Sequence, residues 1–390
     1  MIPYGRHHID EDDIQAVAEV LRHGALTQGP TIEAFEQAVA DYVGAKYAVA
    51  VSSGTAGLHI AALAAGIGPG TSIVTSPITF VASSNAALYC GANVHFADID
   101  PRTINLAPIC LAECLKNHPD VKAVIPVHFA GLPCDMEAIK HLADDAEVSV
   151  IEDAAHALGA KYKNGRLVGS CAYSLMTVFS FHPVKAIAAG EGGMITTNDE
   201  ATYRKLLQLR SHGVNKLDDP FQIIAQSVTN GHKNPWYYEM QTLGFNFRIT
   251  DIQCALALSQ FKKLNTFIAR RCILVKAYDA AFARFHNVHP AQIDGRDESG
   301  HHLYVIRINF EKKGISRGQL MEALLARQIG TQVHYIPVPS HPYYRNLGFK
   351  PEDYPLAQNY YNEALTIPLF YDLTDTMQEQ IIMAIKDLVE

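Results

Sequence analysis

Residues Val49-Ala50-Val51-Ser52-Ser53-Gly54-Thr55-Ala56-Gly57 pass from a β-rich run through a turn of small residues into a helical pattern over 58–63. A helix that starts directly after a strand exposes backbone N–H groups, and such groups bind phosphate. The stretch contains neither G-x-G-x-x-G nor G-x-x-x-x-G-K-[ST], which excludes a dinucleotide fingerprint and a Walker loop. It therefore predicts a cradle for a monophosphate, and an ordinary capped helix is the alternative.

The same change of pattern recurs along the chain. Alternating β-rich and helical stretches indicate parallel strands joined by right-handed helical crossovers. The predicted fold class is thus α/β, with a mainly parallel sheet flanked by helices. The expected strands cover residues 49–51, 72–76, 94–97, 123–127, 148–151, 174–181 and 193–196, and the expected helices cover 9–21, 30–42 and 200–209.

We expect two domains. Residues 1–250 would form an N-terminal segment and a large domain, and residues 251–390 a long connecting helix and a smaller α+β domain. Residues 215–240 mix Gly, Pro, Asn and aromatic residues without a period, which predicts a long loop. The later elements are expected as one helix over 250–285, strands over 303–309 and 330–334, and helices over 317–327 and 374–388.

The composition indicates a globular cytoplasmic enzyme. The chain has 390 residues, of which 48% are hydrophobic, so it can bury a large core. No apolar stretch approaches the ~20 residues of a membrane span, and the first residues lack the apolar core of a signal peptide. A net charge of −8 argues against binding to nucleic acid. Seven cysteines without C-x-x-C, and histidines without H-x-x-x-H or H-E-x-x-H, predict neither disulfides nor a metal site.

Two residues after strand-like runs suggest chemistry. Lys185 follows the mostly apolar run Phe179–Val184, and an amine in apolar surroundings loses its charge easily and can form a Schiff base with an aldehyde. Asp153 ends the apolar run 148–152, and ligands of open α/β sheets gather at the carboxyl ends of strands. An acid there suits the pyridine nitrogen of pyridoxal phosphate (PLP). The alternatives are a surface lysine and a helix-capping aspartate.

These motifs together resemble the fold-type I PLP enzymes, and more closely the nucleotide-sugar aminotransferase family. The similarity runs nearly end to end. The motifs that carry it are Ser52-Ser53-Gly54-Thr55-Ala56, Glu152-Asp153-Ala154-Ala155-His156, Ser180-Phe181-His182-Pro183-Val184-Lys185, Gly190-Glu191-Gly192-Gly193 and Gly244-Phe245-Asn246-Phe247-Arg248-Ile249-Thr250-Asp251.

The resemblance implies roles for individual residues. Lys185 would be catalytic, forming the Schiff base with PLP and moving the substrate proton, and Asp153 would hold the ring nitrogen. Phe80 would stack on the ring, and His156 would contact the side of the ring hydroxyl. The phosphate would be bound by Gly54, Thr55, Ala56 and Ser180, and by Asn246 reaching across the interface of a homodimer with shared active sites. The expected substrate contacts are Tyr4, Arg6, Leu26, Thr27, His182, Arg248, His334 and Tyr335.

Within the family, the chain is similar to the branch that aminates C4 of a UDP-linked 4-keto-6-deoxy-N-acetyl-hexose with L-glutamate in the pseudaminic acid pathway. Short sequence motifs carry this similarity, among them Pro235-Trp236-Tyr237-Tyr238-Glu239-Met240 and Val333-His334-Tyr335-Ile336-Pro337. Another nucleotide-linked 3- or 4-ketosugar is the alternative substrate. A non-catalytic PLP-binding regulator is the alternative from another class, since a fold does not fix an activity. A sugar dehydratase is disfavoured, because that branch carries histidine in place of Lys185.

Overall fold

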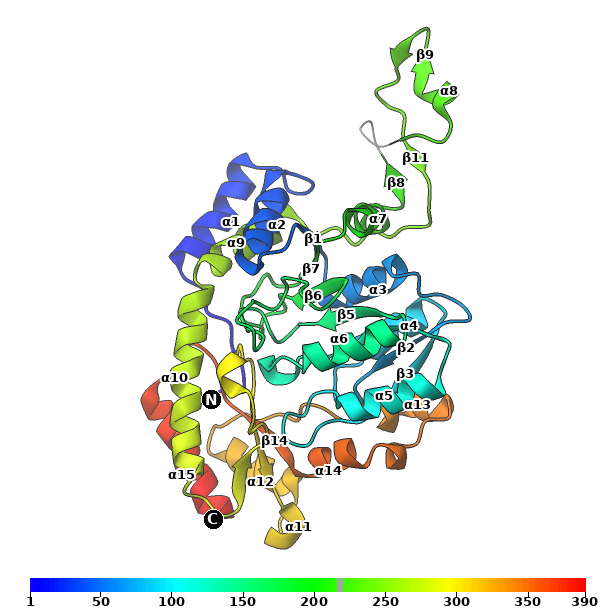
Figure 1. Ribbon diagram of the computed structural model, residues 1–390. Coiled ribbons are helices and arrows are strands. Elements are labelled where there is room, and N and C mark those ends of the chain that lie inside the picture. Colours follow the sequence, from blue (N-terminus) through cyan, green and yellow to red (C-terminus); the bar gives the residue numbers. More distant parts are fainter. Residues whose placement is uncertain (216–219) are drawn as a thin grey trace.

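A computed structural model describes residues 1–215 and 220–390 (Figure 1). Its centre is a seven-stranded sheet in the order β1-β7-β6-β5-β4-β2-β3. Neighbouring strands are parallel except at β7, which runs antiparallel to both β1 and β6. The predicted α/β fold is therefore confirmed. The strands are Tyr47–Val51 (β1), Ser72–Thr75 (β2), Asn93–Phe96 (β3), Val121–Ile125 (β4), Ser149–Asp153 (β5), Met176–Ser180 (β6) and Gly193–Thr197 (β7).

Helices cover both faces of this sheet (Figure 1), and their starts follow the expected capping chemistry. Ser53 caps α3 by accepting the backbone N–H of Ala56, and Asp10 forms a capping box with Asp13 at the start of α1. The helices of this part are Glu11–His23 (α1), Pro30–Val43 (α2), Gly54–Ala64 (α3), Ala82–Tyr89 (α4), Pro108–Asn117 (α5), Met136–Asp145 (α6) and Glu200–Arg210 (α7).

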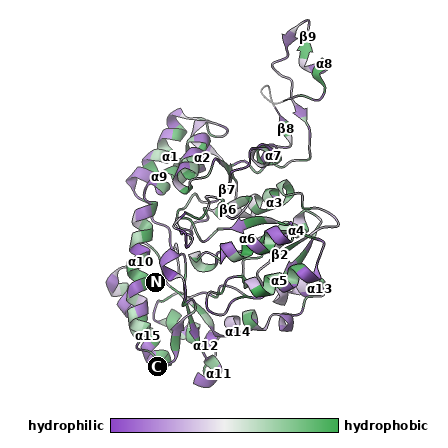
Figure 2. Ribbon diagram, in the orientation of Figure 1, coloured by the Kyte–Doolittle hydropathy of each residue, from purple (hydrophilic) through white to green (hydrophobic). Residues whose placement is uncertain are grey.

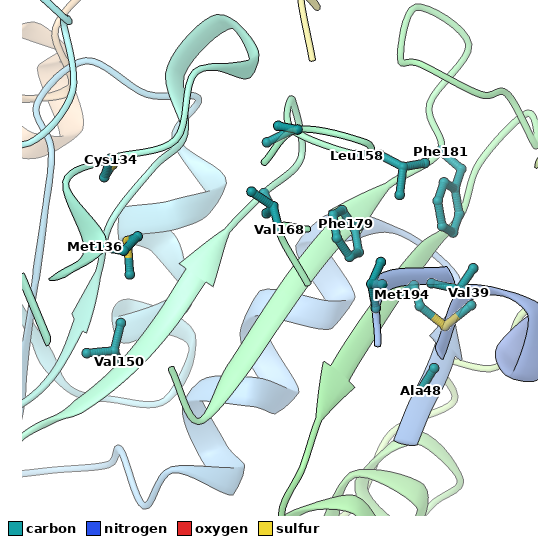
Figure 3. Packing of buried hydrophobic residues seen from close by; sticks show 14 of the residues in the cluster. Val39, Ala48, Cys134, Met136, Val150, Leu158, Val168, Phe179, Phe181 and Met194 are labelled. Carbon is teal, nitrogen blue, oxygen red and sulfur yellow. The ribbon is translucent and has the colours of Figure 1, made fainter. Parts of the chain in front are cut away.

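Successive strand residues enter two different cores. Ala48 and Ala50 of β1 belong to the core beneath α2, whereas Val49 and Val51 belong to the core beneath α3. Figure 3 shows the first core, where Phe179 and other side chains from several strands gather. Helix α3 is buried along nearly all of its length, and Figure 2 accordingly shows it as largely hydrophobic. Both sheet faces are thus covered, as a parallel sheet requires.

A smaller antiparallel sheet, in the order β12-β13-β14, follows in the C-terminal part. Its core also contains Ile2, whose backbone pairs with Ile329. The N-terminal segment therefore packs with the C-terminal sheet, while a domain boundary at residue 250 stays a prediction. The elements here are Asp251–Lys262 (α9), Leu264–Phe282 (α10), Val288–Pro290 (β12), Tyr304–Ile308 (β13), Phe310–Lys313 (α11), Arg317–Ala326 (α12), Pro342–Asn346 (α13), Pro355–Glu363 (α14), Ala364–Ile367 (β14) and Asp375–Val389 (α15).

Two predicted C-terminal elements are wrong. The helix expected over 250–285 is divided into α9 and α10 at Lys263, whose ammonium group lies 3.0 Å from the Asp13 carboxylate of α1. The strand expected over 330–334 is reduced to a single bridge between Gln332 and Thr366, because the chain then turns towards the cavity described below. The other predicted strands and helices are confirmed within a few residues at their ends.

The stretch 215–240 is not a featureless loop. Its described part, residue 215 and residues 220–240, forms an arm that projects away from the rest of the chain (green, upper right in Figure 1). Residues 216–219 of the predicted loop lie outside the described part. The arm contains the short elements Val214–Asn215 (β8), Ile224–Ser227 (α8), Val228–Thr229 (β9), His232–Lys233 (β10) and Glu239–Met240 (β11), which form two small hairpin-like pairings.

Within residues 1–215 and 220–390, no helix combines the length and the apolar composition that crossing a bilayer requires.

Glu152 lies in the core, where its side chain contacts residues that precede or follow neighbouring strands. Its buried carboxylate accepts hydrogen bonds from the hydroxyl groups of Tyr162 and Ser174 and lies 2.7 Å from Nε2 of His128. We expect Glu152→Ala to lower the free energy of unfolding by about 3–5 kcal/mol, since it leaves these buried partners without an acceptor. Urea denaturation at pH 7 measures this, and the exposed Glu379→Ala should change it by less than about 0.5 kcal/mol. Equal effects of the two variants would contradict the argument.

Candidate active site

The carboxyl ends of β1, β5 and β6 meet at one edge of the sheet and surround a cavity of about 460 Å³. This cavity brings together most of the predicted cofactor residues. It is lined by Gly54 and Thr55 from the start of α3, by Phe80 before α4, by Asp153 at the end of β5 and His156 after it, and by Ser180 at the end of β6 and Lys185 after it. Residues that are far apart in the sequence therefore face one space.

Asp153 is fixed at the end of β5. One carboxylate oxygen accepts the hydroxyl of Ser83 at 2.6 Å, and the other accepts the backbone N–H of Ala155 at 3.1 Å. Ser83 in turn lies 2.7 Å from the Thr79 hydroxyl. The sequence analysis missed Ser83, because a serine near the start of a helix carries no signal that it supports an acid on a neighbouring strand.

Lys185 reaches the same cavity from the turn after β6. Its backbone N–H donates to the carbonyl of His182, which closes the turn. Burial lowers the pKa of the Lys185 amine to about 8, although the negative charge of Asp153 acts in the opposite direction. An amine with such a pKa is suited to attack an aldehyde close to neutral pH, and the role of Lys185 as the Schiff-base residue stays a prediction.

The lowered pKa gives a prediction for cofactor loading. Because only the neutral amine reacts, its fraction grows as pH rises through the pKa. We expect the rate at which PLP binds the cofactor-free protein to rise about tenfold per pH unit below pH 8 and to level off above it. The growth of visible absorbance measures this rate. A rate that keeps rising to about pH 10, as for a lysine in water, would contradict the pKa shift.

A compact turn at the start of α3 has the backbone geometry expected of the predicted phosphate cradle. The first N–H groups of a helix have no intrahelical acceptor, so those of Gly54 and Thr55 are available to a ligand. A Cβ atom on Gly54 would come within 2.9 Å of Ser180 Cβ, and one on Gly193 would come within 2.6 Å of the Ser53 carbonyl oxygen. Glycine at 54 and 193 therefore lets two loops meet closely. The N–H of Ala56 donates to Ser53 Oγ in this structure, so its contact with a phosphate stays a prediction.

Phe80 lines the cavity and is 59% exposed, so it does not belong to the apolar core. An aromatic side chain in this position suits stacking on a flat ring. With an acid, a buried amine, a phosphate cradle and an aromatic wall in one cavity, the residues present fit PLP. The stacking role itself stays a prediction.

Four predicted substrate residues also face the cavity, namely Tyr4, His182, His334 and Tyr335. His302 joins them, and its Nδ1 atom is buried without a hydrogen-bond partner in the described chain. His302 was not among the predicted site residues, and the two adjacent histidines His301 and His302 before a strand were the available signal. Burial lowers the pKa of His334 to about 3, so this ring is neutral.

The structure does not bring the other predicted residues into the cavity wall of the same chain. Arg6 lies in a small adjoining space beyond Lys185. Arg248 lines a separate polar hollow with Gln28 and Gly29, because residues 26–29 are held at the start of α9 by the Thr27–Thr250 bridge. The predicted site residues outside the cavity lining are Arg6, Leu26, Thr27, Ala56, Asn246 and Arg248.

Among the described residues, one group offers three side chains of the kinds that bind metals: His95, His118 and Asp120. It lies at the amino end of β4, away from the cavity. The two imidazole rings are stacked, with centroids 3.7 Å apart and planes at 18°, so their ring nitrogens do not point at one position. The cavity is thus the site with a complete set of chemical groups.

Comparison with known proteins agrees with this geometry. The model of the DegT/DnrJ/EryC1/StrS aminotransferase family matches residues 7–386. The chain belongs to this family. As a DegT/DnrJ/EryC1/StrS aminotransferase it is a PLP-dependent enzyme that acts on nucleotide sugars.

Two curated relatives cover almost the whole chain. The spore coat polysaccharide biosynthesis protein SpsC of Bacillus subtilis is 39% identical over all of this chain and 97% of its own length. The UDP-4-amino-4,6-dideoxy-N-acetyl-beta-L-altrosamine transaminase of Campylobacter jejuni is 35% identical over 96% of this chain and 93% of its own. This DegT/DnrJ/EryC1/StrS aminotransferase is thus similar to proteins of glycan biosynthesis.

Solved structures show the same fold. Helicobacter pylori PseC, described as an aminotransferase involved in the biosynthesis of pseudoaminic acid, matches with a TM-score of 0.89 and 30% identity over 100% of this chain and 99% of its own. The PLP form of the putative sugar aminotransferase Spr1654 from Streptococcus pneumoniae matches with a TM-score of 0.88 and 27% identity over 100% and 98%. The fold-type I architecture and the cofactor predicted from the sequence are confirmed.

Proposed function

We propose that the protein transfers the amino group of L-glutamate to C4 of UDP-2-acetamido-2,6-dideoxy-β-L-arabino-hex-4-ulose, a UDP-linked 4-keto-6-deoxy-N-acetyl-hexose, in pseudaminic acid biosynthesis. The observation that carries the proposal is the convergence of Lys185 and Asp153 on one cavity in a sugar aminotransferase. The activity in the name of the C. jejuni relative and the pathway given for H. pylori PseC support this choice of sugar.

PLP, when bound, supplies an aldehyde that carries the amino group and a ring that withdraws electrons from the reacting carbon. The Asp153 carboxylate, held by Ser83, keeps a proton on the ring nitrogen. The Lys185 amine serves as the nucleophile that holds the cofactor and, once released, as the base that moves a proton at the reacting carbon. Thr55 and Ser180 bind the phosphate from the side of β1 and β6.

The sugar would enter from the side of the cavity lined by Tyr4, His182 and His334. Uncharged imidazole and phenol groups suit the hydroxyl and amide groups of an N-acetyl-hexose, because they donate or accept hydrogen bonds without a fixed charge. Two negative charges on the uridine diphosphate call for guanidinium groups, for which we assign Arg6 and Arg248. Since Arg248 lies outside the cavity of its own chain, this assignment requires a second copy.

We further propose that two copies form a homodimer with shared active sites, to which Asn246 contributes a contact with the phosphate. The projecting arm supports pairing, because it carries large apolar side chains that are more than half exposed. Exposed apolar clusters of this kind mark interaction surfaces. The side chains concerned are Ile223, Ile224, Trp236, Tyr238, Met240 and Leu243.

Mixing two inactive variants tests the shared site. Lys185→Ala and Asn246→Ala should each be inactive or weakly active alone. A mixed dimer, however, holds one site in which Lys185 of one chain and Asn246 of the other are both intact. We expect about a quarter of the wild-type activity to return after the two are unfolded and refolded together in equal amounts, since half of the dimers are mixed and each has one good site of two. No recovery, with normal dimers by light scattering, would overturn the shared site.

The substrate is tested with a panel of nucleotide-linked 3- and 4-ketosugars and L-glutamate as the donor. We expect the proposed UDP-sugar to have the highest kcat/KM, and initial rates that give parallel double-reciprocal lines, because both half-reactions use one site. A different ketosugar with the highest kcat/KM would replace the proposed substrate. Intersecting lines would contradict the shared use of one site.

A further inference from the structure

A line of hydrogen bonds runs from the backbone of Ala130 through His156 to Tyr335 in the cavity wall. The N–H of Ala130 lies 3.3 Å from Nδ1 of His156, and Nε2 of the same ring lies 3.1 Å from the Tyr335 hydroxyl. His156 is buried, Tyr335 is partly buried, and both line the cavity. Both nitrogens of His156 are thus engaged by the protein.

The backbone N–H of Ala130 determines which atom donates and which accepts in each of these hydrogen bonds. A backbone N–H can only donate, so Nδ1 of His156 must accept and carries no proton. Burial, and then the positive charge of Lys185 near it, hold the pKa of His156 well below its ordinary value, so the ring is neutral. A neutral imidazole has one proton, which is therefore on Nε2. Nε2–H then donates to the oxygen of Tyr335.

Tyr335 consequently has its own proton free for another acceptor. Burial, and then the negative charge of Asp153, raise the pKa of Tyr335 above its ordinary value, so the hydroxyl keeps that proton. The backbone around it is held, since the carbonyl of His334 accepts the Tyr360 hydroxyl at 2.6 Å and His334 Nδ1 lies 2.8 Å from the Thr366 hydroxyl. These contacts hold the backbone from which Tyr335 extends, and the hydrogen bond to His156 holds the phenol itself.

We propose that Tyr335 is a fixed hydrogen-bond donor to an oxygen atom of the cofactor or substrate, and that His156 is a positioning residue that acts through Tyr335. The acceptor is an anionic or carbonyl oxygen, either the ring oxygen of PLP or an oxygen of the amino donor or ketosugar. His156 therefore does not contact the ring hydroxyl directly, as the resemblance implied, because its Nε2–H is already used. This inference rests on PLP binding and not on the identity of the sugar.

Three variants separate the roles. Tyr335→Phe removes the donor. His156→Leu removes the group that orients it, whereas His156→Gln can still place an N–H near the former Nε2 position. Thermal unfolding of each variant serves as the check that the fold persists.

The first readout is a pH titration of the visible absorbance of the PLP-loaded protein, which needs no substrate. If the acceptor is the PLP ring oxygen, Tyr335→Phe and His156→Leu should move the midpoint upward by about one to two pH units, the size expected for a hydrogen bond to a charged oxygen. His156→Gln should move it much less. If the acceptor belongs to a substrate, the midpoint stays, and the rate at which glutamate bleaches the absorbance, or the rate of the ketosugar half-reaction, should fall at least about tenfold in the same two variants.

The second readout is the ¹⁵N spectrum of protein labelled at histidine. We expect His156 to show a protonated Nε2 and an unprotonated Nδ1 at pH 7, and His156→Gln identifies its signals by their loss. A proton on Nδ1, or on both nitrogens, would overturn the directional argument. A Tyr335→Phe variant with unchanged midpoint and unchanged half-reactions would overturn the donor role. An effect of Tyr335→Phe that His156→Leu does not share would overturn the positioning role of His156.

Discussion

Lys185→Ala should abolish amino transfer, with kcat lowered at least about 10⁴-fold, since the variant loses both a nucleophile and a proton-transferring base. The amine is the group in the cavity whose pKa is lowered to about 8, and no other lysine lines that cavity among the described residues. After borohydride reduction, wild-type protein should carry PLP on the peptide that contains Lys185. The variant should carry none.

The matched control is Lys116→Ala, which removes an exposed lysine from α5. It should retain both activity and the reduced adduct. The thermal unfolding midpoints of the wild-type protein, Lys185→Ala and Lys116→Ala should agree within a few degrees, because neither substitution opens a cavity in an apolar core. Turnover by Lys185→Ala at the native rate, or an adduct on a different peptide, would disprove the assignment.

Asp153→Asn should have the second largest effect. The amide keeps the shape of the carboxylate and can still accept the Ser83 hydroxyl, but it no longer carries the negative charge that holds a proton on the pyridine nitrogen. Loss of one fixed electrostatic group in an active site typically lowers kcat about 10²- to 10³-fold, and we expect a value in this range. Stopped-flow measurement of the glutamate half-reaction gives the rate directly.

Ser83→Ala is the control for Asp153→Asn. It removes the hydrogen bond to the carboxylate but leaves the charge, so the rate should fall only several-fold, in line with the loss of about 1 kcal/mol from one hydrogen bond. Asp153→Glu adds a further comparison, because the charge is kept and displaced. If Asp153→Asn were as active as Ser83→Ala, the charge of Asp153 would not be needed.

Sequence patterns predicted much of the fold and of the cofactor residues, because the relevant signals are local. Strand ends are visible from β-rich runs, and Asp153 and Lys185 follow such runs directly. Parallel strands then bring their carboxyl ends to one edge of the sheet, so three separate motifs predict one cavity. Phe80 was also found, although from the family motif and not from periodicity.

What the sequence did not reveal depends on contacts between distant segments. The break between α9 and α10 involves no proline or glycine, and it lies where Lys263 pairs with Asp13 of a helix far away in sequence. Likewise, Arg248 belongs to a predicted motif but its side chain lines a different hollow from Lys185. A short motif does not encode a helix junction that a remote ion pair stabilises. It also does not encode the direction in which the side chain of an arginine in a loop points.

Strand β5 ends with two neighbouring acids, Glu152 and Asp153, whose side chains have different roles. Glu152 is sealed among hydroxyl groups in the interior, while Asp153 opens onto the cavity, because successive side chains of a strand point to opposite faces. A shift of β5 by one residue against its neighbouring strands would turn Glu152 and Asp153 to the opposite faces, so that one acid would lose its buried partners and the other would leave the cavity. Changes that alter the register of β5 should therefore lower activity far more than substitutions on the enzyme's surface.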